Sequence, residues 1–173
     1  MLTLILGAAA SGKSEYAEEL LMSQPGERIY LATMEPWSEE GKARVEKHRN
    51  ARKDRGFLTI ERYTALNKLM LPASSNVLLE DLGNLVANEL FSPAGGGEAS
   101  VLSGLRYLVN CTSNLTVVSN ELFSGGAAYA GDTLRYLAVL ARANRLLAAR
   151  ADLVVEVVCG LPDIWKGAVP CAF

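Results

Sequence analysis

The sequence begins with residues that can bind phosphate. Residues 7–14 read Gly-Ala-Ala-Ala-Ser-Gly-Lys-Ser and match the P-loop pattern G-x-x-x-x-G-K-S. In such a loop the glycines let backbone amides surround a phosphate. Lys13 then reaches the β- and γ-phosphates, and the Ser14 hydroxyl coordinates Mg²⁺. An apolar run precedes the loop and a helical pattern follows it, as the motif requires. We therefore predict a nucleotide site formed by Gly7, Ala8, Ala9, Ala10, Ser11, Gly12, Lys13 and Ser14.

Two carboxylates follow a second apolar run, at residues 77–79. A carboxylate at the end of such a strand can hold the water shell of Mg²⁺ or accept a proton from a substrate hydroxyl. Asp81 could instead act only as the N-cap of the next helix. We expect a Mg²⁺ site formed by Ser14 and Glu80, with the contact at Glu80 mostly through water.

A third candidate site lies in a charged segment that is predicted to be helical from residue 38 to about residue 52. Arg44, His48 and Arg52 are spaced by four residues and so share one helical face. His48 is the only histidine in the chain. Neighbouring cations disfavour protonation of an imidazole and attract phosphate, which would make His48 a nucleophile toward phosphorus. From the residues alone, an ordinary solvated helix with a lone histidine is the more common explanation of this pattern.

The elements that must position these residues alternate along the chain. We predict strands at residues 2–6, 28–33, 58–62, 77–79, 115–119 and 153–158. Helices are predicted at 13–22, 38–52, after 81 to about 91, 99–111, and from a cap at Asp132 to about 150. This order predicts an α/β fold with a mostly parallel sheet flanked by helices. Ligands bind at the carboxyl ends of such strands, where Gly7, Thr33, Glu80 and Asn120 fall.

Length and composition limit the remaining possibilities. The 173 residues contain neither a repeat nor a long linker, so we expect one domain over residues 1–173, with a disordered tail from about residue 167. The net charge of −2 gives no basic footprint, so nucleic acid is not the expected partner. Cys111, Cys159 and Cys171 lack metal or disulfide spacing. The apolar start is too short for a signal peptide or a membrane span, and we expect a cytoplasmic protein.

Several motifs together resemble one known family, the bifunctional adenosylcobinamide kinase/adenosylcobinamide-phosphate guanylyltransferases of cobalamin biosynthesis. The most specific part is the P-loop followed by His48-Arg49-x-x-Arg52 in this order and spacing. The resemblance also includes Tyr30-Leu-Ala-Thr33, Thr59-x-Glu61, Val77-Leu-Leu-Glu80, Val118-Ser-Asn-Glu121, Arg135, Asn144, Gly160-Leu-Pro162 and Lys166.

The resemblance implies a RecA-like P-loop fold and two activities. The family phosphorylates adenosylcobinamide with a nucleoside triphosphate, then transfers GMP from GTP through a covalent histidine to give adenosylcobinamide-GDP. ATP, GTP and Mg²⁺ are thus implied, as is a homo-oligomer, since family members look like trimers. His48 aligns with the family nucleophile, and Lys13 and Glu80 complete the implied catalytic set. Nucleotide contacts are implied for residues 7–14, Thr33, Met34, Glu35, Arg49, Asn50, Ala51, Arg52, Glu61 and Glu80.

The chain departs from the family pattern in three places. Ala8 and Ala10 replace the usual second glycine and arginine of the loop. Lys53 replaces a proline, and one extra residue precedes Phe57. Ala138, Ala141 and Arg145 stand where the family has Asp, Gly and Gln. Two alternatives therefore remain: a plain P-loop kinase of a small molecule or nucleotide with a structural His48, and a nucleotide-dependent regulatory module.

Overall fold

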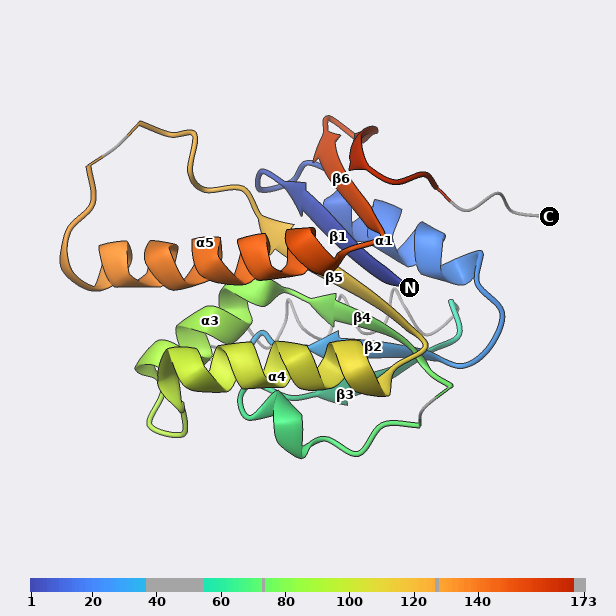
Figure 1. The fold of residues 1–173 in the computed structure, drawn as a ribbon, viewed down its shortest axis with the longest axis horizontal. Helices are drawn as coiled ribbons and strands as arrows, with labels where there is room; N and C mark the ends of the chain where they lie inside the picture. Colours follow the sequence, from blue (N-terminus) through green and yellow to red (C-terminus); the bar gives the residue numbers. More distant parts are fainter. Residues whose placement is uncertain (37–54, 73, 127, 170–173) are drawn as a thin grey trace.

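A single seven-stranded sheet organises the computed structural model, which describes residues 1–36, 55–72, 74–126 and 128–169. The strand order is β3-β2-β4-β5-β1-β6-β7 (Figure 1). All neighbouring pairs are parallel except β6 and β7, which are antiparallel. The strands are β1 Leu2–Gly7, β2 Arg28–Ala32, β3 Phe57–Glu61, β4 Asn76–Glu80, β5 Asn114–Asn120, β6 Leu153–Val158 and β7 Leu161–Lys166.

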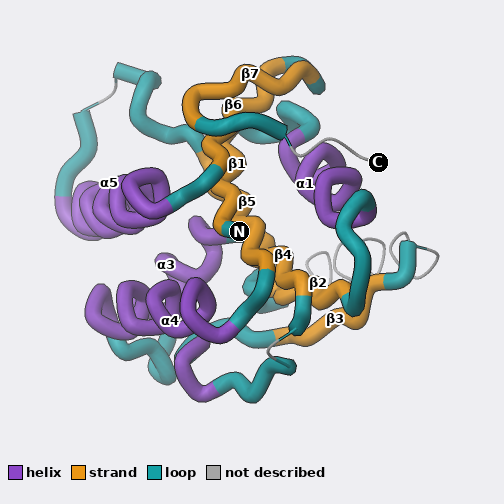
Figure 2. The backbone as a smooth tube through the Cα atoms, turned by 45° about the vertical axis from the view of Figure 1, so that its right-hand side comes forward, coloured by secondary structure: helices purple, strands orange, loops and turns teal. Residues whose placement is uncertain are grey.

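Helices cover both faces of this sheet. Figure 2 shows α1 on one face and α3, α4 and α5 on the other. The helices are α1 Lys13–Met22, α3 Leu82–Phe91, α4 Gly97–Cys111 and α5 Gly131–Arg150, with a short 3₁₀ helix, η1, at Leu66–Lys68. The predicted α/β class with a mostly parallel, helix-flanked sheet is confirmed, and the arrangement is consistent with a P-loop fold.

The core is divided by the sheet into two apolar clusters. The larger one lies beneath α3, α4 and α5 and includes Leu79, Leu105 and Leu140. The smaller one lies beneath α1 and includes Ile5 and Leu21. Because helices cover the central strands on both faces of the sheet, these strands are continuous apolar runs in the sequence. Their positions could therefore be predicted. The loops that follow the carboxyl ends of the strands extend from this packed core and carry polar groups.

Two details of the sequence prediction need correction. Asp132 is not the cap of α5, because the helix begins at Gly131 after Ala130; Asp132 lies in the first turn, where its charge still favours the helix dipole. Strand β7 was not predicted, because all six of its residues are exposed and so give no alternating pattern. It follows a tight turn in which Cys159 and Gly160 both have positive φ, 51° and 80°.

The structure bears on two further predictions, the absence of a membrane span and the disordered tail. No helix within the described ranges is long and apolar enough to cross a bilayer. Residues 167–169 of the predicted tail are described, and Gly167 lies against Asp152, whose carbonyl oxygen would be 2.0 Å from an added Cβ. The helix predicted at 38–52 and residues 170–173 lie outside the described residues.

Candidate functional site

The P-loop connects β1 to α1 in a tight turn that only glycine allows at two positions. A Cβ added to Gly7 would lie 2.5 Å from Ser11 Oγ and 2.7 Å from the Val157 carbonyl oxygen. Gly12 has a φ of 91°, and its Cβ would lie 3.2 Å from Gly160 Cα. Ala10 also adopts a left-handed conformation, with a φ of 57°. Left-handed residues interspersed in such a turn form the amide nests that bind anions.

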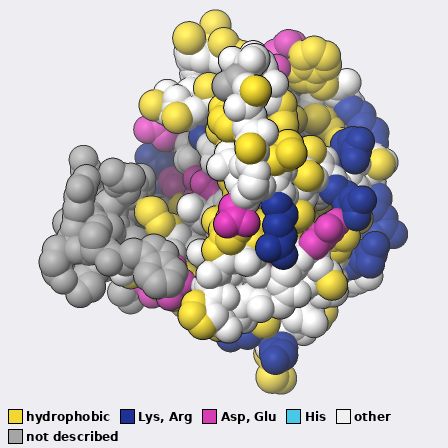
Figure 3. Space-filling view, turned by 90° about the vertical axis from the view of Figure 1, so that its left-hand side faces the viewer, with side chains coloured by type: hydrophobic (Ala, Val, Ile, Leu, Met, Phe, Trp, Pro, Cys, Tyr) yellow, Lys and Arg dark blue, Asp and Glu magenta, His cyan; other side chains and the backbone are white. Residues whose placement is uncertain are grey.

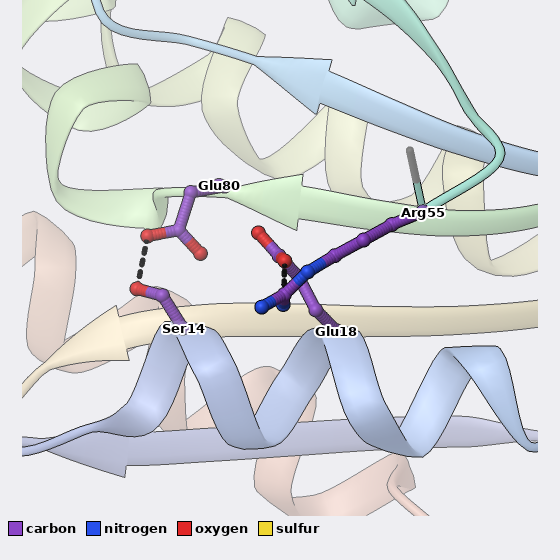
Figure 4. Close-up of polar contacts among 4 residues, drawn as sticks. All are labelled: Ser14, Glu18, Arg55 and Glu80. Carbon is purple, nitrogen blue, oxygen red and sulfur yellow. Dashed lines mark hydrogen bonds and ion pairs between the residues drawn. The ribbon is translucent and has the colours of Figure 1, made fainter. Parts of the chain in front are cut away.

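Lys13 and Ser14 begin α1 at the mouth of this loop. The Lys13 ammonium donates to the Ala8 carbonyl oxygen at 3.2 Å, so the side chain folds back across the loop. The Ser14 hydroxyl donates to Glu80 Oε1 at 2.7 Å, as Figure 4 shows. The other carboxylate oxygen of Glu80, Oε2, is buried without a hydrogen-bond partner among the described residues. A hydroxyl beside an unpartnered carboxylate oxygen matches the all-oxygen ligands of Mg²⁺, so this pair fits the ion.

The charge of Glu80 is poorly compensated. The pKa of its carboxyl is raised from 4.5 to about 7, mainly because the group is buried; the charge of Asp81 also raises it, while the Ser14 hydrogen bond and the Lys13 charge lower it. A carboxyl with this pKa gains strongly from a cation, since a positive charge favours its ionised form. The site is therefore electrostatically suited to receive a divalent ion.

Thr33 follows β2 and ties two strand ends together. Its amide donates to the Glu80 carbonyl oxygen at 3.0 Å. Its hydroxyl donates to the carbonyl oxygens of Glu80 at 3.1 Å and of Asp81 at 2.7 Å. The Asn88 side chain of α3 donates to the Thr33 carbonyl oxygen at 2.7 Å. Thr33 is fully buried, whereas Met34 and Glu35 are half-buried, so the latter two are the more accessible to a ligand.

Asp81 acts as the N-cap of α3, which is the alternative that the sequence left open. Its Oδ1 accepts from the Asn84 amide at 2.6 Å, and its Oδ2 accepts from Asn120 Nδ2 at 3.2 Å. Burial raises the pKa of this carboxyl, and the two hydrogen bonds lower it. Because both oxygens are engaged, the structure favours Glu80 over Asp81 as the carboxylate that faces the P-loop.

Glu61 ends β3 on the same edge of the sheet. Ala32 of β2 is in register with Glu61 on one side and with Glu80 on the other. The Glu61 side chain is exposed and accepts from the Tyr63 hydroxyl at 3.0 Å. The structure thus brings residues 7–14 and Glu80 into one site and places Thr33, Met34, Glu35 and Glu61 along its edge. Arg44, His48, Arg49, Asn50, Ala51 and Arg52 lie outside the described residues.

Three groups near this site are not among the site residues predicted from the sequence. The Gly160 amide donates to the Ser11 carbonyl oxygen at 2.8 Å, so the β6–β7 turn supports the P-loop. Glu18 of α1 forms an ion pair with Arg55 at 2.5 Å, close to Glu80 (Figure 4). The i, i+4 spacing of Ser14 and Glu18 could have indicated that Glu18 shares the Ser14 face. Nothing in the sequence indicates Arg55, since its approach depends on how the sheet is assembled.

Comparison with known proteins points to one family. The family model described as cobinamide kinase / cobinamide phosphate guanyltransferase matches residues 3–164. The "Bifunctional adenosylcobalamin biosynthesis protein CobU" of Escherichia coli is 29% identical, over 93% of this chain and 97% of the relative. The Salmonella typhimurium protein of that name has the same identity and coverage. "Bifunctional adenosylcobalamin biosynthesis protein CobP" of Pseudomonas aeruginosa is 30% identical, over 96% and 98%. This chain is therefore a transferase that belongs to the cobinamide kinase/cobinamide phosphate guanyltransferase family.

Proposed function

We propose that this protein phosphorylates the hydroxyl of adenosylcobinamide and then converts the phosphate to adenosylcobinamide-GDP with GTP. The observation that carries the proposal is the P-loop with its Ser14–Glu80 hydrogen bond, in a chain that matches bifunctional relatives over nearly its whole length. A P-loop alone is shared by many unrelated functions. The family match is what selects this acceptor among the possible ones.

In the first step the P-loop binds the triphosphate and this chain's own residues orient it. The amides of residues 7–14 surround the phosphates, and Lys13 moves from the Ala8 carbonyl oxygen to the β- and γ-phosphates. Ser14 and Glu80 would hold Mg²⁺, whose charge would offset that of the phosphoryl oxygens. Glu80 would also accept the proton of the attacking hydroxyl.

In the second step His48 accepts GMP. An imidazole nitrogen attacks the α-phosphorus of GTP, pyrophosphate leaves, and the phosphate oxygen of the corrinoid then displaces the histidine. The support is the His48-Arg49-x-x-Arg52 motif, whose arginines would spread the developing charge. We assign further nucleotide contacts to Thr33, Met34, Glu35, Arg49, Asn50, Ala51, Arg52 and Glu61 on the same grounds.

Product analysis tests this function. Wild-type protein with ATP, Mg²⁺ and adenosylcobinamide should give the phosphate, and added GTP should give the GDP derivative, both identified by mass. Lys13→Ala should lower kcat/KM of the first step at least about a hundredfold, because a charge that stabilises the transition state is lost. Lys68→Ala, at the exposed end of η1, is the matched control and should be unaffected.

Two outcomes of this assay would favour the alternatives. Phosphorylation of other small alcohols or nucleotides, with none of adenosylcobinamide, would indicate a plain P-loop kinase. Tight nucleotide binding without turnover of any acceptor would indicate a regulatory module.

We also propose that the protein works as a homotrimer. The support from the structure is a set of large apolar side chains at the beginning of α5 and in the loop before it, each between 40% and 55% exposed: Leu122, Phe123, Tyr129 and Leu134. Figure 3 shows exposed hydrophobic side chains between polar and charged ones on this side of the molecule. Large apolar side chains that remain exposed are typical of surfaces that bind another protein.

A further inference from the structure

Glu18 places a second carboxylate on the helix face that carries Ser14. It lies one turn after Ser14 in α1, and only 7% of its surface is exposed. Figure 4 shows its side chain rising from α1 toward β4, the strand that ends in Glu80. A buried carboxylate is costly unless it is paired, and here it would also add negative charge beside a site that must accept a triphosphate.

Arg55 supplies the pairing charge from a distant part of the chain. Its Nη1 lies 2.5 Å from Glu18 Oε2, and its side chain runs along α1 toward the P-loop end (Figure 4). The following residues are fixed as well. Gly56, with a φ of 72°, lies against the Arg28 guanidinium, and the Phe57 ring meets Tyr30 edge to face at 6.2 Å between centroids. Arg55 thus reaches Glu18 from an anchored position.

We propose that Arg55 is a positioning residue that neutralises Glu18 and so keeps the P-loop site favourable to the anionic nucleotide. Without the guanidinium, the Glu18 carboxylate would repel the bound triphosphate. The inference rests on the proposed nucleotide site. It concerns a residue that forms no part of the P-loop and that forms an ion pair with Glu18 on the Ser14 face of α1.

Nucleotide titration of four variants tests this role. The probe is ATP with Mg²⁺, measured by calorimetry for Arg55→Met, Glu18→Gln, the double variant and wild type. Arg55→Met should weaken binding on the order of tenfold, because a like charge is uncovered near the phosphates. Glu18→Gln should bind as tightly as wild type or more tightly, because it leaves a free positive charge. The double variant should return to within about threefold of wild type, since the two charges are removed together.

A matched control is available in the Arg142–Glu98 pair, which joins α5 to α4 at 2.6 Å and is largely exposed. Arg142→Met should leave nucleotide affinity unchanged. If Arg55→Met fails to fold, Arg55→Ala takes its place, and it should weaken ATP binding relative to the double variant; equal binding by the two would overturn the inference.

Several results would overturn the inference. Equal weakening of ATP binding by Arg55→Met and Glu18→Gln would mean that the pair only holds α1 to the residues before β3. A double variant as weak as Arg55→Met would mean that Arg55 contacts the nucleotide directly, and an unchanged Arg55→Met would remove any role. If wild-type protein itself binds no nucleotide, the proposed function fails instead.

Discussion

The groups around Glu80 shift the pKa of its carboxyl in opposite directions. The Ser14 hydroxyl and Lys13 favour its carboxylate, while burial and Asp81 disfavour it and hold its pKa at about 7. In the protein without metal or nucleotide, this balance makes the folded state bind a proton that the unfolded chain, with a pKa near 4.5, has already lost. Stability should therefore depend on pH through this residue.

The first prediction concerns that dependence. Below pH 4.5 the carboxyl is protonated in both states, and above pH 7 it is ionised in both, with the folded state destabilised by the buried charge. The free energy of unfolding of wild type should thus fall by about 3 kcal/mol relative to Glu80→Gln as pH rises through this window. Urea denaturation in EDTA from pH 4.5 to 8 measures the difference. A difference that does not vary with pH would contradict the assignment.

The second prediction concerns Gly7. In Gly7→Ala the new Cβ would meet the Val157 carbonyl oxygen of β6, which is backbone and cannot rotate away. We expect the free energy of unfolding to fall by roughly 2 kcal/mol, because the loop must move to relieve the contact. We also expect nucleotide binding to fall below the measurable range. Thermal unfolding and ATP titration measure the two effects. Gly125→Ala is the control, since no atom lies within 4 Å of its added Cβ. Equal effects of both changes would show that loop crowding is unimportant.

At the scale of elements, α3 depends on the residue that follows Glu80. Asp81 caps this helix through the Asn84 amide. Asp81→Ala should lower the free energy of unfolding by about 1 kcal/mol, whereas Asp81→Asn should lower it by less, because asparagine caps equally well. Chemical denaturation of the two variants measures this. An Asn variant as unstable as the Ala variant would mean that the charge of Asp81 matters and its capping does not.

The elements differ in how far the sequence could predict them. The buried strands and α1 could be predicted, because covered parallel strands are uniformly apolar and α1 follows a recognisable loop. Strand β7 could not, since its exposed residues carry no periodic pattern. The residues of the site also differ in how far the sequence could predict them. Ser14 and Glu80 follow from local motifs. The Glu18–Arg55 pair joins α1 to the residues just before the edge strand β3, and no local pattern indicates a contact between parts of the chain so far apart.

At the scale of the whole molecule, the apolar side chains near the start of α5 predict self-association. Sedimentation equilibrium should give three times the mass of the chain. Leu134→Asp should shift the protein toward monomer, because a charge buried at an apolar interface is strongly unfavourable. Met70→Asp is the control, since Met70 is 95% exposed on another part of the surface. A wild-type monomer at all concentrations would contradict the proposed trimer.

We propose that the chain carries GMP on His48 between GTP and the corrinoid. The most direct test is incubation with GTP labelled at the α-phosphate, followed by denaturation and measurement of protein-bound label. Wild type should acquire acid-labile label, because a phosphorus–nitrogen bond forms at the imidazole, and His48→Ala should acquire none while still phosphorylating adenosylcobinamide. An unlabelled wild type, or equal labelling of His48→Ala, would contradict the covalent mechanism.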